Sequence, residues 1–189
     1  MKPRSATELL DHLILRAEEN HQIVTALSRL SEQELHQRPQ PDAWSALEAI
    51  EHLNLWNDLY LGRTEAAIAN TTTSPSPEFT SSWLGNKFAA GMKPGSKTRK
   101  VPTLRKLKPR TAGLTKATID TWLDNAERQR SLLGQARAVD LTRVKIKTAL
   151  TSLLSMRLGD VLRMIVYHNW RHIEQAERAT RGLAGIRTS

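Results

Sequence analysis

The sequence predicts an all-α fold, a four-helix bundle with one long crossover connection between the second and third helices. Four long stretches place apolar residues near a 3.6-residue period, and no segment sustains the alternation of apolar and polar residues that is typical of half-buried strands. One long polar connection, residues 71–113, separates the two middle helices. Long amphipathic helices bury their apolar stripes against one another, which favours a bundle and a single domain over residues 1–189.

The first helix is expected to run from a cap at Ser5 or Thr7 to about Leu30. Prolines then interrupt the periodic pattern, because proline lacks a backbone donor and restricts the residue before it. The second helix is expected from near Pro41 to about Asn70. Its apolar positions are Trp44, Leu47, Ile50, Leu53, Trp56 and Tyr60.

The remaining elements follow the long connection. Within the connection, which is rich in Ser, Thr, Pro, Gly and Lys, a short helix is expected at 82–90. The third helix is expected at about 115–137, and the fourth from near 159 to about 181. Between them, residues 139–155 include β-branched side chains, so this link is expected to be strand-like or irregular.

Composition excludes several kinds of protein. The chain has 189 residues, 39% of them hydrophobic and none of them Cys. It can bury a core, and it has no disulfide framework, thiolate zinc site or cysteine nucleophile. No apolar run approaches the ~18 residues of a membrane span, and Asp11 and His12 interrupt the first apolar run too early for a signal peptide. These features indicate a cytoplasmic protein that does not span a membrane.

Positive charge is concentrated in one part of the chain. The formal net charge is +9, and residues 79–119 hold ten Lys and Arg with no Asp or Glu. The segment 93–110 alone has eight bases and almost no aromatic residue, which argues against stacking on single-stranded nucleic acid. This segment can be a solvated loop, bind phosphates without sequence specificity, or supply cations to an anionic cofactor.

Two histidines of the last helix carry the strongest chemical signal. His168 and His172 are four residues apart, so both rings project from one side of the helix, within an otherwise apolar stripe. Buried neutral imidazoles need hydrogen-bond partners or an ion, because an unpaired buried polar group is costly. The pair can therefore bind a divalent metal, or it can hydrogen-bond to core carbonyls and side chains. His52, on one face of the second helix, is open to the same two interpretations.

Two motifs resemble those of the DinB-like superfamily of four-helix bundles. The first, in the second helix, is Trp-Ser-x-x-Glu-x-x-x-His-Leu, formed here by Trp44, Ser45, Glu48, His52 and Leu53. The second, in the last helix, is Leu-Gly-Asp…His-x-x-x-His-x-x-Gln, formed here by Leu158, Gly159, Asp160, His168, His172 and Gln175. The resemblance implies a divalent metal, zinc or nickel, held by His52, His168 and His172, with coordination positions open to water or substrate. It also implies enzymes that use low-molecular-weight thiols, and pairing of long helices into a homodimer.

The resemblance favours a metal-dependent enzyme that acts on a small-molecule substrate, as a thiol-dependent transferase or a hydrolase. Glu48 and Gln175 are candidates to orient an imidazole, and Glu48 is also the candidate catalytic acid or base. Trp56 or Tyr60 is expected to touch a ligand, and Arg171 is expected on a solvated face. The alternatives are a non-catalytic binder of nucleic acid or another polyanion, and a structural dimeric bundle.

Overall fold

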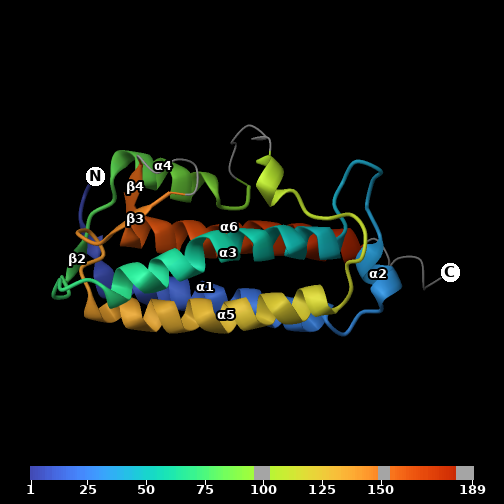
Figure 1. Cartoon of the computed structure of the whole chain (residues 1–189), viewed down its shortest axis with the longest axis horizontal. Coiled ribbons are helices and arrows are strands. Elements are labelled where there is room, and N and C mark those ends of the chain that lie inside the picture. Colours follow the sequence, from blue (N-terminus) through green and yellow to red (C-terminus); the bar gives the residue numbers. More distant parts are fainter. Residues whose placement is uncertain (96–102, 149–153, 182–189) are drawn as a thin grey trace.

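Four long helices form the body of the protein. The computed structural model describes residues 1–95, 103–148 and 154–181. Its long helices are α1 (Ala6–Leu27), α3 (Ala46–Ala69), α5 (Ala117–Gln135) and α6 (Leu158–Arg181). Figure 1 shows them lying side by side along the long axis of the molecule. Helix α3 packs on α5 and α6, and α1 packs on the same two helices. Within the described residues, no helix is both long enough and apolar enough to cross a membrane.

The second long helix begins later than the sequence pattern predicts. Ser45 and Glu48 form a capping box, in which each side chain accepts a hydrogen bond from the backbone amide of the other residue. Helix α3 therefore starts at Ala46 rather than near Pro41. The capping box supplies partners for amides that the first turn of a helix leaves free, which fixes the start of the helix at this point.

The other helices lie close to their predicted positions. Helix α4 (Trp83–Gly91) confirms the short helix expected within the connection. Two short 3-10 turns, η1 (Arg105–Leu107) and η2 (Ala136–Ala138), flank α5 in the chain. The short helix α2 (Glu32–His36) was not predicted, because a helix of five residues is too short to show a period.

Two small antiparallel sheets accompany the helices. The pairs are β1 (Arg4–Ser5) with β2 (Glu78–Phe79), and β3 (Lys145–Lys147) with β4 (Ser155–Arg157). The second pair confirms the strand-like character expected of residues 139–155, of which 149–153 lie outside the described residues. Ile146 lies opposite Met156 and both are buried. Strands of two or three residues are too short to show the alternation that would predict them.

A buried polar chain fixes how α6 is turned relative to α3 and α5. The indole Nε1 of Trp122 on α5 donates to Asn169 Oδ1 at 2.8 Å, and Asn169 Nδ2 donates to Asn57 Oδ1 on α3 at 3.2 Å. All three side chains are buried. Because an unpaired buried polar group is unfavourable by about 1–3 kcal/mol, these bonds disfavour other rotations of α6. They thereby help to hold the neighbouring His168 toward α3.

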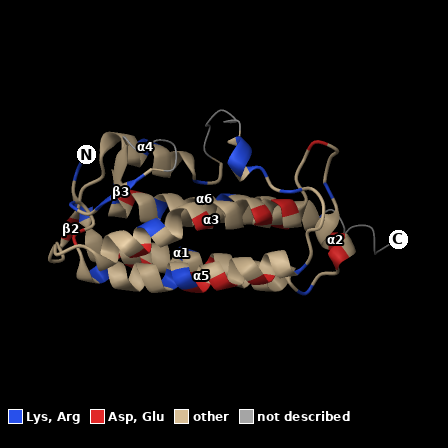
Figure 2. Cartoon of the chain, viewed as in Figure 1, with Lys and Arg blue, Asp and Glu red and all other residues tan. Residues whose placement is uncertain are grey.

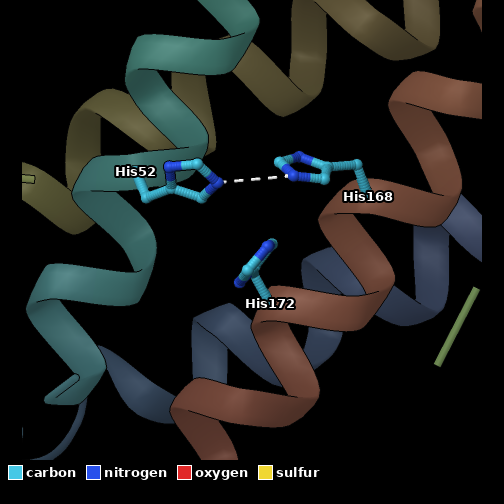
Figure 3. A group of neighbouring side chains, drawn as sticks. All are labelled: His52, His168 and His172. Atoms are coloured by element: carbon cyan, nitrogen blue, oxygen red, sulfur yellow. Dashed lines mark hydrogen bonds between the residues drawn. The ribbon is translucent and has the colours of Figure 1, made fainter. Parts of the chain in front are cut away.

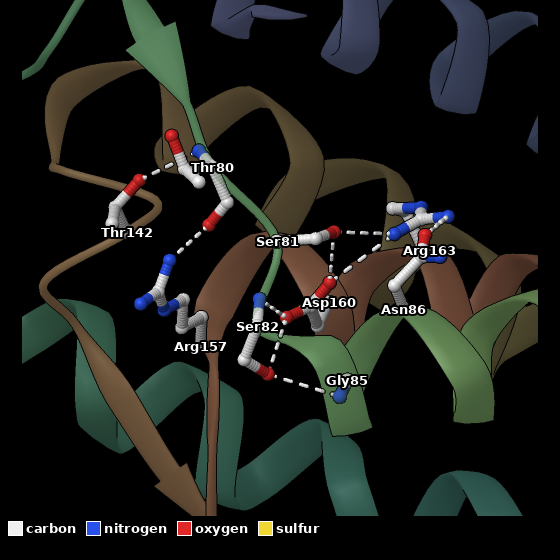
Figure 4. Close-up of polar contacts among 9 residues, drawn as sticks. All are labelled: Thr80, Ser81, Ser82, Gly85, Asn86, Thr142, Arg157, Asp160 and Arg163. Atoms are coloured by element: carbon white, nitrogen blue, oxygen red, sulfur yellow. Dashed lines mark hydrogen bonds and ion pairs between the residues drawn. The ribbon is translucent and has the colours of Figure 1, made fainter. Parts of the chain in front are cut away.

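A buried ion pair joins α4 to the start of α6 (Figure 4). Asp160 and Arg163, both on α6, pair at 3.2 Å and are almost completely buried. Residues just before and within α4 hydrogen-bond to both side chains: Ser81 Oγ to Asp160 Oδ1 (2.5 Å), Ser82 N to Asp160 Oδ2 (3.1 Å), Arg163 Nη1 to Ser81 Oγ (2.7 Å) and Arg163 Nη2 to Asn86 Oδ1 (3.0 Å). A buried charge is tolerated only when it is paired in this way, so the cluster fixes the position of α4 on α6.

A substitution at Gly85 of α4 tests whether the Asp160–Arg163 cluster anchors α4 to α6. A Cβ added at Gly85 would lie 2.1 Å from Asp160 Oδ2, so Gly85→Ala must displace the buried carboxylate. We expect the free energy of unfolding, measured by urea denaturation, to fall by about 2–4 kcal/mol. Gly62→Ala is the matched control, because Gly62 is an exposed residue of α3 with nothing within 4 Å of an added Cβ. That variant should gain about 0.5–1 kcal/mol from helix propensity, and equal stability of the two variants would contradict the anchor.

Candidate metal centre

Three histidines meet between α3 and α6 (Figure 3). His52 extends from α3, and His168 and His172 extend from successive turns of α6. One ring nitrogen of each lies within 4.8 Å of the others. His52 and His168 are buried, at 4% and 5% exposure, and His172 is half-buried. The two histidines of α6 share a face because they are one turn apart, and the packing of α3 on α6 brings His52 against that face. The structure thus brings the predicted triad together.

Hydrogen bonds fix where two of the rings carry their proton. His52 Nδ1 lies 2.7 Å from the backbone carbonyl oxygen of Leu107, and His172 Nδ1 lies 2.9 Å from Gln175 Oε1. A carbonyl oxygen only accepts hydrogen bonds, so both rings donate from Nδ1 and carry a lone pair on Nε2. The Nε2 lone pair is available to a metal ion, and the bond at Nδ1 holds the ring in orientation.

His168 is held differently from the other two. Its Nε2 lies 3.3 Å from His52 Nε2. Its Nδ1 is buried and has no hydrogen-bond partner within residues 1–95, 103–148 and 154–181. Because His52 Nε2 carries a lone pair, His168 must donate in the metal-free protein, and its proton lies on Nε2. For both Nε2 atoms to bind a metal, the proton of His168 must move to Nδ1.

Burial keeps the three imidazoles neutral. Burial lowers the pKa of His52 below its ordinary value of 6.5, although the hydrogen bond to Leu107 acts in the opposite direction. Burial also lowers the pKa of His168 well below 6.5, and the nearby His172, His52 and Arg171 lower it further. Burial and the neighbouring His52 lower the pKa of His172 to about 3. At pH 7 a metal ion therefore does not have to displace a proton from an imidazolium to bind these rings.

The donor set fits a divalent transition metal. Three neutral imidazoles are ligands that suit zinc, nickel and copper. The 3.3 Å between Nε2 of His52 and Nε2 of His168 is close to the ~3.3 Å expected between two nitrogens that each lie ~2.0–2.1 Å from one tetrahedral zinc ion. The triad is therefore able to hold a metal ion.

The backbone carbonyl of Leu107, rather than the expected Glu48, is the acceptor that orients the ring of His52. The Glu48 carboxylate accepts from the Ser45 amide at 2.9 Å and forms an ion pair with Arg38. It is not the acceptor for His52, whose Nδ1 bonds to Leu107 instead. No residue pattern could have indicated Leu107, because every residue has a carbonyl group. The structure does bring Gln175 to His172, as the sequence predicts.

Two tryptophans flank the triad. The ring centroid of Trp56 lies 4.1 Å from that of His168, and the ring centroid of Trp44 lies 5.0 Å from that of His52. Tyr60 packs on Trp56, with ring centroids 4.9 Å apart. Of the two residues expected to touch a ligand, Trp56 is thus the one in direct contact with a histidine of the triad. Contact of Trp56 with a ligand remains a prediction.

Arg171 does not lie on a solvated face as the sequence predicts. It is half-buried, and its Nη1 donates to the backbone carbonyl of Gly91, at the end of α4, at 3.1 Å. The position of α4 on α6 explains the difference, because α4 covers this part of α6. The Arg171 charge also lowers the pKa of His168 and of His172, so the guanidinium contributes positive potential at the triad.

The lowered histidine pKa values predict how the stability of the metal-free protein depends on pH. A histidine of the unfolded chain titrates near pH 6.5, whereas burial lowers the pKa of His172 in the folded protein to about 3. Below about pH 6.5 the unfolded state therefore binds more protons than the folded state, so stability decreases with decreasing pH. We expect the free energy of unfolding, measured by urea denaturation, to fall by a few kcal/mol between about pH 6.5 and about pH 4.

The substitution His172→Gln isolates the contribution of one ring to this pH dependence. The variant lacks the group that resists protonation in the folded state, so its stability should fall less between about pH 6.5 and about pH 4 than that of the unaltered protein. If both proteins lose the same stability over this range, His172 is not buried as a neutral ring.

Comparison with known proteins agrees with this site. The sequence pattern of the DinB superfamily matches residues 14–176, which include all three histidines and most of the chain. No curated protein and no solved structure matches the chain. The match to the superfamily confirms the resemblance seen in the two sequence motifs. The chain belongs to the DinB superfamily.

Proposed function

We propose that this protein binds one divalent transition metal ion, zinc or nickel, through His52, His168 and His172, and uses it in a reaction of a small molecule. The observation that carries the proposal is the convergence of three neutral imidazoles, with one nitrogen of each within 4.8 Å of the others. The chain has no cysteine to provide a thiolate ligand. Three protein ligands leave a coordination position for water or substrate, as in catalytic zinc sites.

The chain's own groups prepare the site for the ion. The Leu107 carbonyl and the Gln175 amide orient the rings of His52 and His172, and the Trp56 ring limits the access of water to His168. When bound, the ion would supply Lewis acidity, and three neutral ligands leave its double positive charge intact.

Transfer or hydrolysis on a small molecule is the reaction class that we propose. A thiol-dependent transferase, acting with a low-molecular-weight thiol, is the version that the superfamily favours. Glu48 has no catalytic part in this proposal, because its carboxylate is engaged by Ser45 and Arg38. An acid or base for the reaction is therefore not assigned to a side chain.

We infer further that the four long helices form a four-helix bundle of the DinB type. The crossover 71–113 would then connect its second and third helices, and residues 1–189 would be one metal-binding domain. The packing of α3 and α1 on both α5 and α6 supports this arrangement. We also propose that the protein is cytoplasmic and forms a homodimer through its long helices, as the superfamily favours.

Metal content tests the proposal. Untagged protein purified without added metal should contain about one equivalent of zinc or nickel by mass spectrometry, because the three imidazoles are neutral and none has to release a proton to solvent when the ion binds. The double variant His168→Ala/His172→Ala should contain none and should unfold at a lower temperature than the loaded protein. His12→Ala is the control, because His12 is an exposed histidine outside the triad, and this variant should keep the metal.

Two results would contradict the proposal. If the double variant retains stoichiometric metal, the assignment of the site is wrong. If the unaltered protein takes up no metal even after zinc or nickel is supplied, the triad is a structural feature of the core. The alternatives of a polyanion-binding protein and a structural dimer would then be favoured.

The hydrogen bond from His172 to Gln175 predicts that loss of the Gln175 amide weakens zinc binding without abolishing it. Gln175→Leu removes the acceptor and keeps a side chain of similar size. Loss of such an acceptor should weaken zinc binding about 10-fold or more, measured by competition with a chromogenic chelator. Arg178→Leu is the matched control, because Arg178 is an exposed residue of the same helix that pairs with Glu174. If the two variants lose zinc affinity equally, Gln175 does not orient His172.

A further inference from the structure

The pair of strands β3 and β4 presents basic side chains to solvent, at the end of the molecule where α6 begins. From residue 143 to residue 148 the side chains alternate between exposed and buried. The buried set packs into the core, and Ile146 belongs to it. The exposed set consists of Arg143, Lys145 and Lys147. Figure 2 shows basic residues along β3.

No acidic side chain within this part of the chain balances these cations. Residues 141–159 contain four Lys and Arg and no Asp or Glu. Asp140, which precedes them, is engaged locally: its Oδ1 accepts from the backbone amides of Thr142 at 2.8 Å and Arg143 at 3.0 Å. Its Oδ2 lies 3.9 Å from Arg143 Nε. Within the described residues, the side chains of Lys145 and Lys147 take part in no ion pair.

Like charges lie directly opposite one another on the two strands. Lys145 on β3 is the register partner of Arg157 on β4. Such a pair destabilises an antiparallel ladder, because the Cβ atoms of opposite residues are only about 4.5–5.5 Å apart. Helix α3 brings a further cation, since Arg63 Nη1 donates to the backbone carbonyl of Lys147 at 3.4 Å. The fold leaves this repulsion uncompensated, whereas an anionic partner would neutralise it.

The exposed cations form a row, which is longer than one small anion. In extended backbone, every second residue lies about 6.6–6.8 Å further along the same side, so the row from Arg143 to Lys147 is about 13 Å long. A single carboxylate or phosphate can meet only part of such a row. A polymer that carries a phosphate on every unit can meet all of it, and it releases its counterions as it binds.

An exposed tryptophan lies near the row. Trp83, the first residue of α4, is 71% exposed, more than any other large apolar side chain in the described residues. Arg157 Nη1 donates to the backbone carbonyl of Thr80 at 2.5 Å, so β4 is joined to the residues that lead into α4 (Figure 4). Lys87 Nζ lies 5.2 Å from the centroid of the Trp83 ring. Proteins that bind single-stranded nucleic acid without sequence preference combine cations for phosphates with aromatic rings for bases.

We infer that single-stranded nucleic acid binds, without sequence preference, to the basic face, defined as Arg63, Arg143, Lys145, Lys147, Arg157 and Trp83. The cations meet phosphates, and a base stacks on the indole of Trp83. The basic face is separate from the triad, because Leu158, where α6 begins, precedes His168 by ten residues, or about 15 Å of helix. It also differs from the basic segment 93–110, of which residues 96–102 lie outside the described residues.

Fluorescence anisotropy with a short labelled oligodeoxythymidine tests this inference. The variant Lys145→Ala/Lys147→Ala should bind about tenfold more weakly at low salt than the unaltered protein. Its plot of log affinity against log salt should be less steep by about 1.4, because each phosphate contact with a single strand contributes about 0.7 to the slope. Trp83→Ala should weaken binding about fivefold or more and keep the slope, because stacking releases no counterion.

The matched control is Arg105→Ala/Lys108→Ala. These two residues are exposed at the η1 turn, within the basic segment 93–110, and their replacement removes the same net charge. This variant should keep the affinity and the salt dependence of the unaltered protein. Equal losses in both double variants would mean that total charge, rather than the basic face, governs binding. A loss in the control alone would assign binding to the segment 93–110, and either result would overturn the inference.

The opposition of Lys145 and Arg157 provides a second readout. Lys145→Glu places a carboxylate opposite Arg157. We expect this variant to unfold at a higher urea concentration than the unaltered protein and to bind the oligonucleotide more weakly than Lys145→Ala. A Lys145 that served only the fold would give the reverse result for stability. A lower unfolding midpoint for Lys145→Glu would therefore contradict the repulsion on which the inference rests.

A membrane surface is the competing anionic partner, because lipid headgroups also carry phosphates. Sedimentation with vesicles of phosphatidylcholine and phosphatidylglycerol in equal parts distinguishes the two. We expect the protein to bind the oligonucleotide and to remain in the supernatant with the vesicles at the same salt concentration. Sedimentation with the vesicles and no binding of the oligonucleotide would assign the basic face to a membrane surface. Failure to bind the oligonucleotide even at low salt would by itself overturn the inference.

Discussion

The burial of three uncharged imidazoles at one point between α3 and α6 is the constraint on which the rest of this structure depends. Polar rings removed from water need partners, and the fold provides acceptors for two of them, at Leu107 and Gln175. The third ring, His168, is left with a buried Nδ1 that has no hydrogen-bond partner in the described part of the chain. The bonds at Leu107 and Gln175 leave Nε2 of His52 and of His172 without a proton, and Nε2 of His168 becomes a third ligand once its proton moves to Nδ1.

The surrounding elements hold this arrangement in place. The bonds from Trp122 to Asn169 and from Asn169 to Asn57 fix the rotation of α6, and the buried Asp160–Arg163 pair fixes α4 upon it. Polar contacts of this kind are specific in geometry, whereas apolar packing alone tolerates small rotations. The η1 turn adds a contact from outside the long helices, because its Leu107 carbonyl orients His52.

Much of the site could be predicted from the sequence, because its ligands lie on periodic helices. The spacing of His168 and His172 placed them on one face, and the motif around His52 linked it to them. The acceptor at Leu107 could not be predicted, since a backbone carbonyl 55 residues away carries no residue-type signal. The role expected of Glu48 was displaced by its capping bond with Ser45 and its pairing with Arg38. The strand pair of β1 and β2 and the helix α2 escaped prediction because periodicity needs a longer stretch.

Long-range proton–nitrogen correlation NMR of the histidine rings, in metal-free protein at pH 7, tests the central claim most directly. The shifts of Nδ1 and Nε2 report which nitrogen carries the proton and whether the ring is charged. The account predicts three neutral rings, with the proton on Nδ1 in His52 and His172 and on Nε2 in His168. A charged imidazolium in the triad, or a proton on Nε2 of His52 or His172, would contradict the claim that the fold prepares these rings for a metal ion.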